Sequence, residues 1–399
     1  MIHRKKVVII GGGAAGLIAA ELLSATHDVH IYEKGKAAGR KFLVAGKGGF
    51  NLTNNVDGEE LYSKYQPYSL LHKSLTSYDT KAFRQWLLKL GVPTYVGSSG
   101  RVFPEKGIKP IEVLQKILDK LHQKNVQFYF QHEFLSFNND NQIVVKQKEN
   151  NINVSADYFI FALGGASWSV TGSDGKWINS FDKVGVKTFP FQASNCGVSI
   201  DWPKEFTTNF AGTPLKNIQV SIDDFSVKGE VLITEYGLEG NAIYPAIPSI
   251  RQKLNQKEAV CVNIDLKPQN TLEELLQKIS GKNIQTKNYK HVFNLSGVQI
   301  ALLKLHTIKE DYLSPDKFCK QIKKLKIPIT SLRPIEEAIS TVGGICKTEV
   351  NSNFSLKAYP KIFVIGEMID WDAPTGGFLL QGCFSTAAYA AQSILNFKE

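Results

Sequence analysis

The sequence predicts an α/β fold whose first part contains a parallel sheet. Residues 7–10 form a short and wholly apolar run, Val-Val-Ile-Ile, which is typical of a strand buried on both faces. A glycine-rich turn at residues 11–16 then leads into a helical pattern at 17–23. Residues 29–32 read as a second strand, which ends at Glu33. Strand, glycine turn, helix, strand and acid in this order predict a Rossmann-like unit that binds a dinucleotide.

Each glycine of the turn has its own physical reason. Gly11 permits the tight turn from strand to helix, and Gly13 allows the backbone to approach a pyrophosphate. Gly16 lets the helix pack closely on the strand. Ala14 and Ala15 lie in the turn before this helix and are counted with the glycines as candidate binding residues. The helix N-terminus is expected to supply unpaired N–H groups and a positive dipole end for the phosphates.

The residues after the second strand extend the predicted site. Glu33 is placed to accept hydrogen bonds from an adenosine ribose, and its charge argues against a 2′-phosphate on the nucleotide. The next segment is basic and rich in glycine, which suits a loop that wraps a diphosphate and follows a longer cofactor. An ordinary surface loop is the alternative. The candidate binding residues in this segment are Lys34, Gly39, Arg40, Lys41, Gly46 and Asn51.

Composition and length exclude several classes of protein. The chain has 399 residues, of which 43% are hydrophobic and 21% charged, so two or three domains with a sizeable core are expected. Five scattered cysteines without a Cys-x-x-Cys pair predict no zinc site, no metal site of that type and no vicinal redox disulfide. The apolar stretch after residue 6 contains four glycines, which favours a loop over a secretory signal. We therefore expect a cytoplasmic protein without a membrane span.

The formal net charge of +10 has two interpretations. Its densest local contribution comes from five lysines between Lys317 and Lys326. A solvated helix face explains such a run, whereas a surface for nucleic acid is the alternative. No interleaved aromatic residues or RNA-binding signature accompany the lysines, so the first interpretation is favoured.

Four stretches of sequence resemble one known family. The segment Gly39 to Asn54 fits the pattern G-R-K-x-x-x-[SA]-G-x-G-x-x-N-x-T-N, which is similar to a signature of the BaiN-like flavoproteins, also called the aminoacetone-oxidase-like FAD-binding family. Gly-Arg-Val-Phe-Pro at 100–104 resembles a second element of that family. Residues 161–175 resemble a third, and residues 341–377 resemble its closing signature. The resemblance covers nearly the whole chain and implies that the dinucleotide is non-covalently bound FAD.

The resemblance also implies further cofactor-binding residues. In flavoproteins of this architecture, the last Gly-[Asp/Glu] motif and the helix that follows it run beneath the ribityl chain and pyrimidine end of the flavin. The helix N-terminus, expected near Leu379 or Leu380, would stabilise the anionic reduced flavin. The residues implied are Ala162, Gly164, Gly366, Glu367, Gly376, Gly377, Phe378 and Leu379.

Two segments depart from the family pattern. Gly49-Phe50 stand where the family usually has Arg-Cys, and Phe378-Leu379 stand where it usually has Tyr-Asn. Both departures fall in segments expected near the flavin, so the substrate cannot be carried over from relatives. No catalytic residue is assigned. The polar candidates are Ser167, Tyr236, Asp370, Asp372 and Gln381, and a structural role is favoured for each.

The resemblance implies an FAD-binding domain of the glutathione-reductase type that is interrupted by a second domain. The expected boundaries are 1–190 and 335–399 for the FAD-binding domain and 191–334 for the insert. Short strand-like runs at 198–200, 218–222, 231–234 and 260–264 give the insert a β part. A capping box at Thr271 opens its helical part, residues 271–326. Residues 361–365 and 384–397 are expected to form a returning strand and a closing helix.

These observations predict an FAD-dependent oxidoreductase that moves a hydride between the flavin and a small organic substrate. No second strand–glycine turn–helix–acid unit is evident, so NAD(P)H would act as a transient co-substrate. Two alternatives remain open. One is a flavoprotein that binds or modifies RNA, which would use the positive charge. The other is a flavin-bound protein without turnover.

Overall fold

The chain divides into two compact units. The computed structural model describes residues 4–44, 49–138 and 142–397. One unit comprises Met1–Gln192 with Ile339–Glu399, and the other comprises Ala193–Ala338. The first division falls two residues after the predicted boundary at 190, and the second falls four residues after the predicted boundary at 334. Strand β11 (Thr188–Ser194) runs through the first division, so neither a loop nor a linker marks it in the sequence.

The first unit is built around a five-stranded parallel sheet. Its strand order is β20-β10-β1-β2-β6, with β1 (Lys6–Ile10) in the centre. Ile9 pairs with Ile31 of β2 on one side and with Ile160 of β10 on the other. The strands are β2 (Asp28–Glu33), β6 (Gln127–Phe130), β10 (Tyr158–Phe161) and β20 (Ile362–Val364). This mixed α/β unit with a parallel sheet confirms the predicted fold class.

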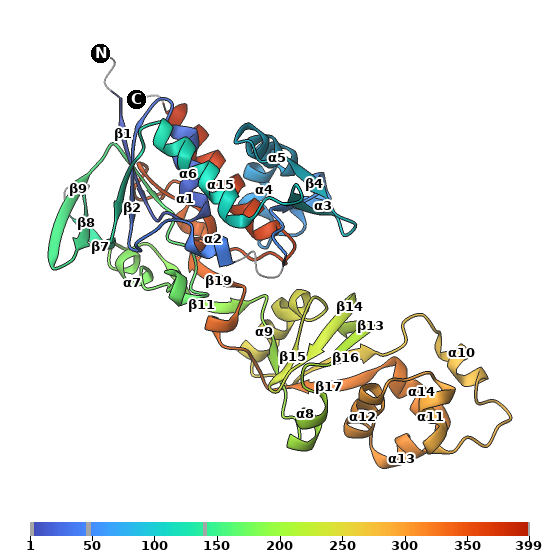
Figure 1. The fold of residues 1–399 in the computed structure, drawn as a ribbon. Coiled ribbons are helices and arrows are strands. Elements are labelled where there is room, and N and C mark those ends of the chain that lie inside the picture. The colour runs from blue at the N-terminus through green and yellow to red at the C-terminus, as the bar shows by residue number, and fades with distance from the viewer. Residues whose placement is uncertain (1–3, 45–48, 139–141, 398–399) are drawn as a thin grey trace. The chain divides into compact units, whose positions relative to one another are not determined.

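Alternate residues of the sheet face two different cores. Val7 and Ile9 pack with the helices α1 (Ala14–Leu23), α6 (Pro110–Gln123) and α15 (Phe378–Leu395). Figure 1 shows these three helices together on one face of the sheet. Val8 and Ile10 instead pack with residues of β8 (Gln142–Gln147) and β9 (Asn150–Ser155). Because both faces are covered, β1 is apolar at four successive positions rather than at alternate ones.

Shorter elements complete the first unit. A three-stranded antiparallel sheet has the order β7-β8-β9, and a second one has the order β3-β5-β4. Strand β11 pairs with β19 in a two-stranded sheet. The remaining bounds are α2 (Arg40–Val44), β3 (Thr53–Asn54), α3 (Gly58–Tyr62), α4 (Tyr68–Ser77), α5 (Thr80–Lys89), β4 (Thr94–Val96), β5 (Arg101–Pro104), β7 (His132–Asn138), α7 (Ile178–Asp182) and β19 (Ser340–Ile345).

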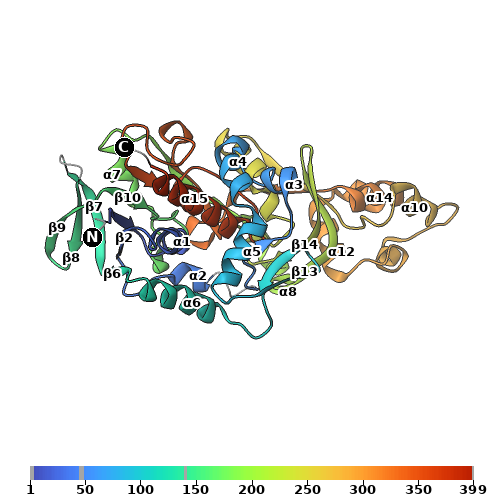
Figure 2. The same ribbon diagram turned by 90° about the horizontal axis from the view of Figure 1, so that it is seen from above.

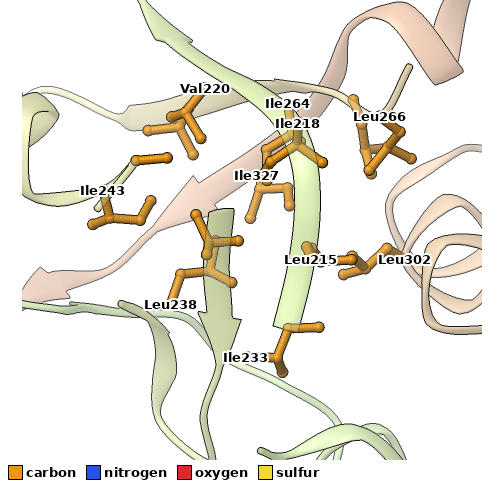
Figure 3. Close-up of a cluster of buried hydrophobic side chains, with 14 of the residues drawn as sticks. Leu215, Ile218, Val220, Ile233, Leu238, Ile243, Ile264, Leu266, Leu302 and Ile327 are labelled. Atoms are coloured by element: carbon orange, nitrogen blue, oxygen red, sulfur yellow. The ribbon is translucent and has the colours of Figure 1, made fainter. Parts of the chain in front are cut away.

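The second unit contains a seven-stranded sheet with the order β17-β16-β13-β14-β15-β12-β18. Its central strands β13 (Pro214–Ile222) and β14 (Phe225–Ile233) form an antiparallel hairpin. Figure 3 shows Leu215, Ile218 and Ile233 from this hairpin meeting Leu302 in one apolar core. The other strands are β12 (Val198–Ser199), β15 (Gly237–Glu239), β16 (Val260–Asp265), β17 (Leu325–Ile329) and β18 (Ser331–Leu332).

The helical part of the second unit follows β16. Figure 2 places its labelled helices α10, α12 and α14 together at one end of the unit. The expected capping box is present, because Thr271 Oγ1 accepts from the Glu274 N–H and the Glu274 carboxylate accepts from the Thr271 N–H. The helices of this part are α10 (Leu272–Gln277), α11 (Tyr289–Val292), α12 (Gly297–His306), α13 (Lys309–Leu313) and α14 (Pro315–Lys323). Two further helices of the unit, α8 (Lys204–Phe210) and α9 (Ile247–Asn255), precede β16.

The closing helix differs from its predicted bounds of 384–397. Helix α15 begins at Phe378, directly after Gly377, which has φ +100°. A side chain on Gly377 would collide with the backbone of Thr53, 2.4 Å away, so glycine is required where the helix starts. This start lies within two residues of the N-terminus that the resemblance implies near Leu379 or Leu380, whereas the helical pattern alone places the start at Phe384. Among the described residues, no helix is both long and apolar enough to cross a membrane.

The buried carboxylate of Glu21 connects three helices of the first unit through hydrogen bonds. Glu21 lies on α1 and is only 8% exposed. It accepts hydrogen bonds from Trp86 Nε1 on α5 at 2.9 Å and from Lys124 Nζ, directly after α6, at 2.7 Å. A buried carboxylate is costly unless it is paired, so both donors stabilise the position of α1.

The variant Lys124→Met should therefore lower the free energy of unfolding by about 3 kcal/mol, because it leaves the buried Glu21 charge without its cation. The exposed-lysine variant Lys106→Met should change it by less than about 0.5 kcal/mol. Urea unfolding followed by tryptophan fluorescence measures both, because four of the five tryptophans lie in the first unit. Equal urea concentrations at the unfolding midpoint for the two variants would contradict the structural role of the hydrogen bonds to Glu21.

Candidate functional site

The first unit contains a cavity of about 380 Å³ at the carboxyl ends of its parallel strands. Ile10 and Glu33, the last residues of β1 and β2, line it. Ala162 and Ile365, which directly follow β10 and β20, also line it. Ligands of open α/β sheets bind outside the carboxyl ends of the strands, so this is the candidate site.

The glycine turn forms one wall of the cavity. Gly11 has φ +107°, and its N–H donates to the Tyr32 carbonyl oxygen at 2.8 Å. A Cβ at Gly11 would lie 2.4 Å from the Ala162 carbonyl oxygen, and one at Gly16 would lie 2.1 Å from the Gly11 carbonyl oxygen. By contrast, no atom lies within 4 Å of the position that a Cβ at Gly13 would take. The turn therefore packs tightly against neighbouring backbone at Gly11 and Gly16, whereas the space beside Gly13 is empty.

This geometry fits the phosphates of a dinucleotide. Helix α1 begins at Ala14, and both Ala14 and Ala15 line the cavity. The first N–H groups of a helix have no partner inside the helix, and its N-terminus carries a positive partial charge. No acidic residue lies in the first turn of α1 to oppose an anion. The residues that line the cavity thus suit the pyrophosphate of FAD.

Glu33 is fixed at the edge of the cavity by the backbone. One carboxylate oxygen accepts from the Gly12 N–H at 2.8 Å and the other accepts from the Gly35 N–H at 2.6 Å. Each carboxylate oxygen can accept more than one hydrogen bond, so further acceptor capacity is left for a ribose.

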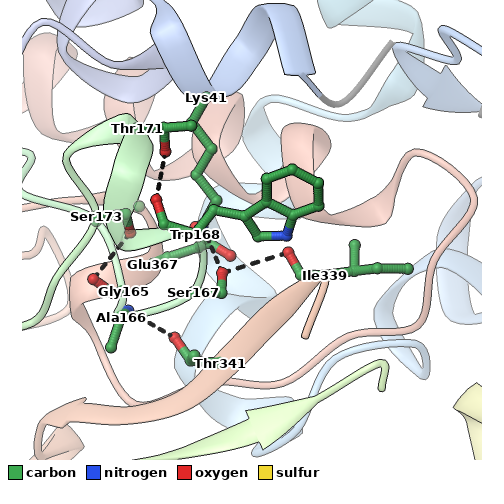
Figure 4. Close-up of polar contacts among 12 residues, drawn as sticks. Lys41, Gly165, Ala166, Ser167, Trp168, Thr171, Ser173, Ile339, Thr341 and Glu367 are labelled. Carbon is green, nitrogen blue, oxygen red and sulfur yellow. Dashed lines mark hydrogen bonds and ion pairs between the residues drawn. The ribbon is translucent and has the colours of Figure 1, made fainter. Parts of the chain in front are cut away.

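Cationic side chains join the loop after β2 to the segment that follows β10. Lys41 Nζ lies 2.8 Å from Ser167 Oγ and 2.9 Å from Glu367 Oε2. Lys34 forms an ion pair with Asp174 at 3.0 Å, and Arg40 donates to the Val170 carbonyl oxygen at 2.7 Å. Figure 4 shows the Lys41 side chain directed toward Ser167 and Glu367. The Lys41–Glu367 pair joins residues that are 326 positions apart and that both line the cavity.

Helix α15 contributes a second helix N-terminus. Leu379, Leu380 and Cys383 from its first turns line the cavity. Burial raises the pKa of the Cys383 thiol to about 12, so this group is a neutral thiol and not a nucleophile at neutral pH. Burial likewise raises the pKa of the Tyr32 hydroxyl to about 12. The cavity is thus lined by neutral tyrosine and cysteine groups beside the Lys41–Glu367 ion pair.

The structure brings fourteen of the twenty predicted cofactor-binding residues to this cavity. Gly46 lies outside the described residues. Gly16, Asn51, Gly376, Gly377 and Phe378 do not line the cavity; Gly16 and Gly377 serve close packing, and the Phe378 side chain is buried in a core. The residues that line the cavity are Gly11, Gly13, Ala14, Ala15, Glu33, Lys34, Gly39, Arg40, Lys41, Ala162, Gly164, Gly366, Glu367 and Leu379.

The five polar candidates take part in structural contacts. Ser167 binds Lys41, and Asp370 accepts from the Gly343 N–H at 2.9 Å. Gln381 is fully buried and accepts from Thr53 Oγ1 at 2.7 Å. Asp372 is buried. Tyr236 lies in the second unit, where its hydroxyl donates to Glu239. No catalytic assignment follows from these contacts.

Sequence analysis missed part of the wall. Residues 132–135 on β7 line the cavity, as do Trp177 and Ser180 on or beside α7. Trp177 Nε1 donates to the Gly164 carbonyl oxygen at 3.0 Å, which fixes the segment after β10. None of these residues belongs to a local motif, so only the folded chain identifies them. Among the described residues, no group of three or more His, Cys, Asp or Glu side chains could hold a metal ion.

Comparisons with known proteins identify the family of this chain. The family model described as "HI0933-like protein Rossmann domain" matches residues 5–393. A ribosomal RNA dihydrouridine synthase of Escherichia coli strain K12 is 25% identical over 414 residues, covering all of both chains. One of Haemophilus influenzae is 24% identical over 406 residues, covering 97% of this chain and 98% of the relative. A 3-dehydro-bile acid Δ(4,6)-reductase of Clostridium scindens is 24% identical over 422 residues, with 97% and 98% covered.

Two solved structures share the fold. A 3-ketosteroid-Δ4-(5α)-dehydrogenase of Rhodococcus jostii has a TM-score of 0.50 at 13% identity, covering 98% of this chain and 97% of that one. A flavocytochrome c3 fumarate reductase has a TM-score of 0.52 at 13% identity, covering 100% of this chain and 79% of that one. Together with the bile-acid reductase, the family match confirms the resemblance that the motifs predicted.

The open position at Gly13 yields a specific prediction. In the variant Gly13→Ala, the added methyl group meets no protein atom, so the fold should be retained. The methyl group should hinder the approach of the pyrophosphate and raise the Kd for FAD at least tenfold, a loss of about 1.4 kcal/mol. Titration of the apoprotein with FAD measures this. Gly297→Ala, at an equally open position in the second unit, is the control, and an unchanged Kd for Gly13→Ala would contradict the placement of the phosphates.

The Cys383 thiol gives a pH-dependent prediction. Because its pKa is raised to about 12, almost no thiolate exists below pH 10, and alkylation by iodoacetamide at pH 8 should leave Cys383 unmodified. Cys261, which is likewise partly exposed, provides the comparison within the same chain. Peptide mapping after alkylation reads out both sites, and rapid labelling of Cys383 in the folded protein would contradict the raised pKa of its thiol.

Proposed function

Because this chain belongs to the family of HI0933-like proteins with a Rossmann domain, we propose that it reduces a carbon–carbon double bond that is conjugated to a carbonyl group. The chain is an FAD-dependent oxidoreductase, and the proposal concerns its substrate and its electron donor. The reaction class is a two-electron reduction, in which one alkene carbon receives a hydride and the other receives a proton.

The chemistry common to the relatives carries this proposal. Two relatives are named for making dihydrouridine, which differs from uridine by two hydrogens across the C5=C6 bond, and that bond is conjugated to the C4 carbonyl. Another is named as a Δ(4,6)-reductase of a 3-dehydro bile acid, whose double bonds are conjugated to the C3 ketone. These names differ in substrate but share the reduction of an electron-poor alkene.

The cavity supports the same chemistry. When bound and reduced, FAD supplies the hydride. Gly13 and the first turn of α1 suit its pyrophosphate, and Glu33 suits its ribose. The charge of Lys41 is balanced by Glu367, whereas the N-terminus of α15 places positive partial charge at the cavity. That partial charge favours the reduced state of a flavin, which carries negative charge.

We also propose that NADH or NADPH is the electron donor. Sequence patterns identify only one dinucleotide-binding unit, and the residues of that unit line the FAD site. The nicotinamide cofactor therefore acts as a transient reductant, not as a permanently bound group.

An anaerobic two-step experiment tests the proposal. Purified holoenzyme is first mixed with NADH or NADPH, and bleaching of the flavin absorbance should follow with at least one of them. The reduced protein is then mixed with a steroid 4-en-3-one or with uridine-containing RNA. Rapid return of the oxidised spectrum, together with a saturated product detected by mass spectrometry, is expected for one of these substrates.

Apoprotein stripped of FAD is the matched control and should give no product with either substrate. A protein that accepts electrons from NADH or NADPH but passes them only to oxygen would contradict the proposal and indicate an oxidase. A bound flavin that no nicotinamide donor reduces would contradict the proposed electron source.

A further inference from the structure

The positive charge of the second unit is concentrated in its helical lobe, defined as residues 267–326. The 35 residues from 275 to 309 contain six lysines and no aspartate or glutamate. The whole lobe has twelve Lys and five Asp or Glu residues, which gives it a formal net charge of +7. The lobe thus carries most of the +10 charge of the chain on a small part of its length.

Two lysines of the lobe have structural roles and are not counted among the lysines that can contact a partner. Lys323 Nζ contacts the Asp265 carboxylate at 2.7 Å and donates to the Lys267 carbonyl oxygen at 2.9 Å. Lys267 donates to the Asn294 carbonyl oxygen, and burial lowers its pKa. The Lys323 amino group joins the lobe to β16 and that of Lys267 makes a contact within the lobe, so neither is available to a partner.

Most of the other lysines are exposed. Lys317 alone among them forms an ion pair in the described part of the chain, with Asp311 at 2.8 Å. On α14, Lys317 and Lys320 lie three residues apart on a face that does not include the buried Phe318 and Ile322, and Lys324 directly follows the helix. The exposed lysines are Lys282, Lys287, Lys290, Lys304, Lys309, Lys317, Lys320, Lys324 and Lys326.

An aromatic cluster makes the lobe one packed body. The ring of Tyr289 on α11 stacks on that of Phe318 on α14, with centroids 4.1 Å apart. Phe293 and Tyr312 contact Phe318 at 5.7 Å and 5.2 Å. The backbone positions of the lysines beside Tyr289 and Phe318 are therefore fixed before any partner binds, which lowers the entropic cost of binding a polyanion.

The side chains between the lysines favour RNA over a lipid surface. Exposed amides, Asn283, Gln285 and Asn288, separate Lys282, Lys287 and Lys290, and such groups contact phosphate and sugar in nucleic-acid complexes. A membrane-binding surface instead needs apolar side chains that can insert between lipids. The strongly exposed apolar residues of the lobe lie at positions 305–313, outside the segment 278–290.

We propose that the helical lobe binds the phosphodiester backbone of RNA through its exposed lysines. This inference does not rest on the proposed function, because it depends on the charge and structure of the lobe alone.

Fluorescence anisotropy tests the lobe with holoenzyme and a labelled RNA hairpin that has a uridine-rich loop. The wild-type protein should bind with an affinity that falls steeply between roughly 50 and 200 mM KCl. The triple variant Lys282→Gln, Lys287→Gln, Lys290→Gln should bind at least tenfold more weakly. Its slope of log affinity against log salt should be smaller by about 2, at about 0.7 for each lost phosphate contact.

A matched control removes the same charge elsewhere. The triple variant Lys73→Gln, Lys89→Gln, Lys183→Gln changes three exposed lysines of the first unit and should bind RNA like the wild-type protein. A second lobe variant, Lys320→Gln, Lys324→Gln, Lys326→Gln, should weaken binding in the same way as the first. Retention of FAD and an unchanged melting temperature show that the variants are folded.

The outcomes separate the two proposals. Equal RNA affinity of the lobe variants and the control overturns the lobe proposal, as does binding of the wild-type protein to phosphatidylglycerol vesicles but not to RNA. Reduction of the steroid enone by the lobe variants at the wild-type rate shows that the flavin site is intact. RNA binding through the lobe without any reduction of an alkene would instead overturn the proposed function.

Discussion

The turn between β1 and α1 is where the sheet, the helix and the cavity meet. The Gly11 N–H donates to the end of β2, and the space that a Gly11 side chain would need is filled by the Ala162 carbonyl at the end of β10. Gly16 brings the helix back against the same turn. A side chain at Gly11 or Gly16 would separate these elements, so the position of the cavity depends on this close backbone approach.

The parts of the site that sequence predicts are those whose geometry is local. The order of β1, the glycine turn, α1, β2 and Glu33 specifies its own structure, because a βαβ unit closes within about thirty residues. The Lys41–Glu367 pair and the β7 wall are different, since they arise only when distant segments meet. The motif that contains Gly377 and Phe378 predicts contacts to the cofactor. In the structure, Gly377 instead lets α15 begin in close contact with the backbone of Thr53.

The cavity and the largest concentration of positive charge lie in different units of the enzyme. The first contains the cavity with its paired charges, whereas the second contains the helical lobe with its excess of lysine. Relatives of similar length are named for reactions on ribosomal RNA and on a bile acid, so a shared reduction step is compatible with very different substrates. Among the departures from the family pattern, Phe50 packs against Phe42 in a core and Phe378 is buried in another core, whereas Leu379 lines the cavity. Leu379 is therefore the departure that can alter contacts to the cofactor.

The most direct test of the account is the identity and stoichiometry of the flavin. The purified protein is denatured, and the released cofactor is separated by chromatography and quantified against the protein concentration. The account predicts one FAD per chain, released without proteolysis. FMN in its place, or a protein that stays colourless after incubation with FAD, would contradict the assignment of the cavity beneath the Gly11 turn to a dinucleotide.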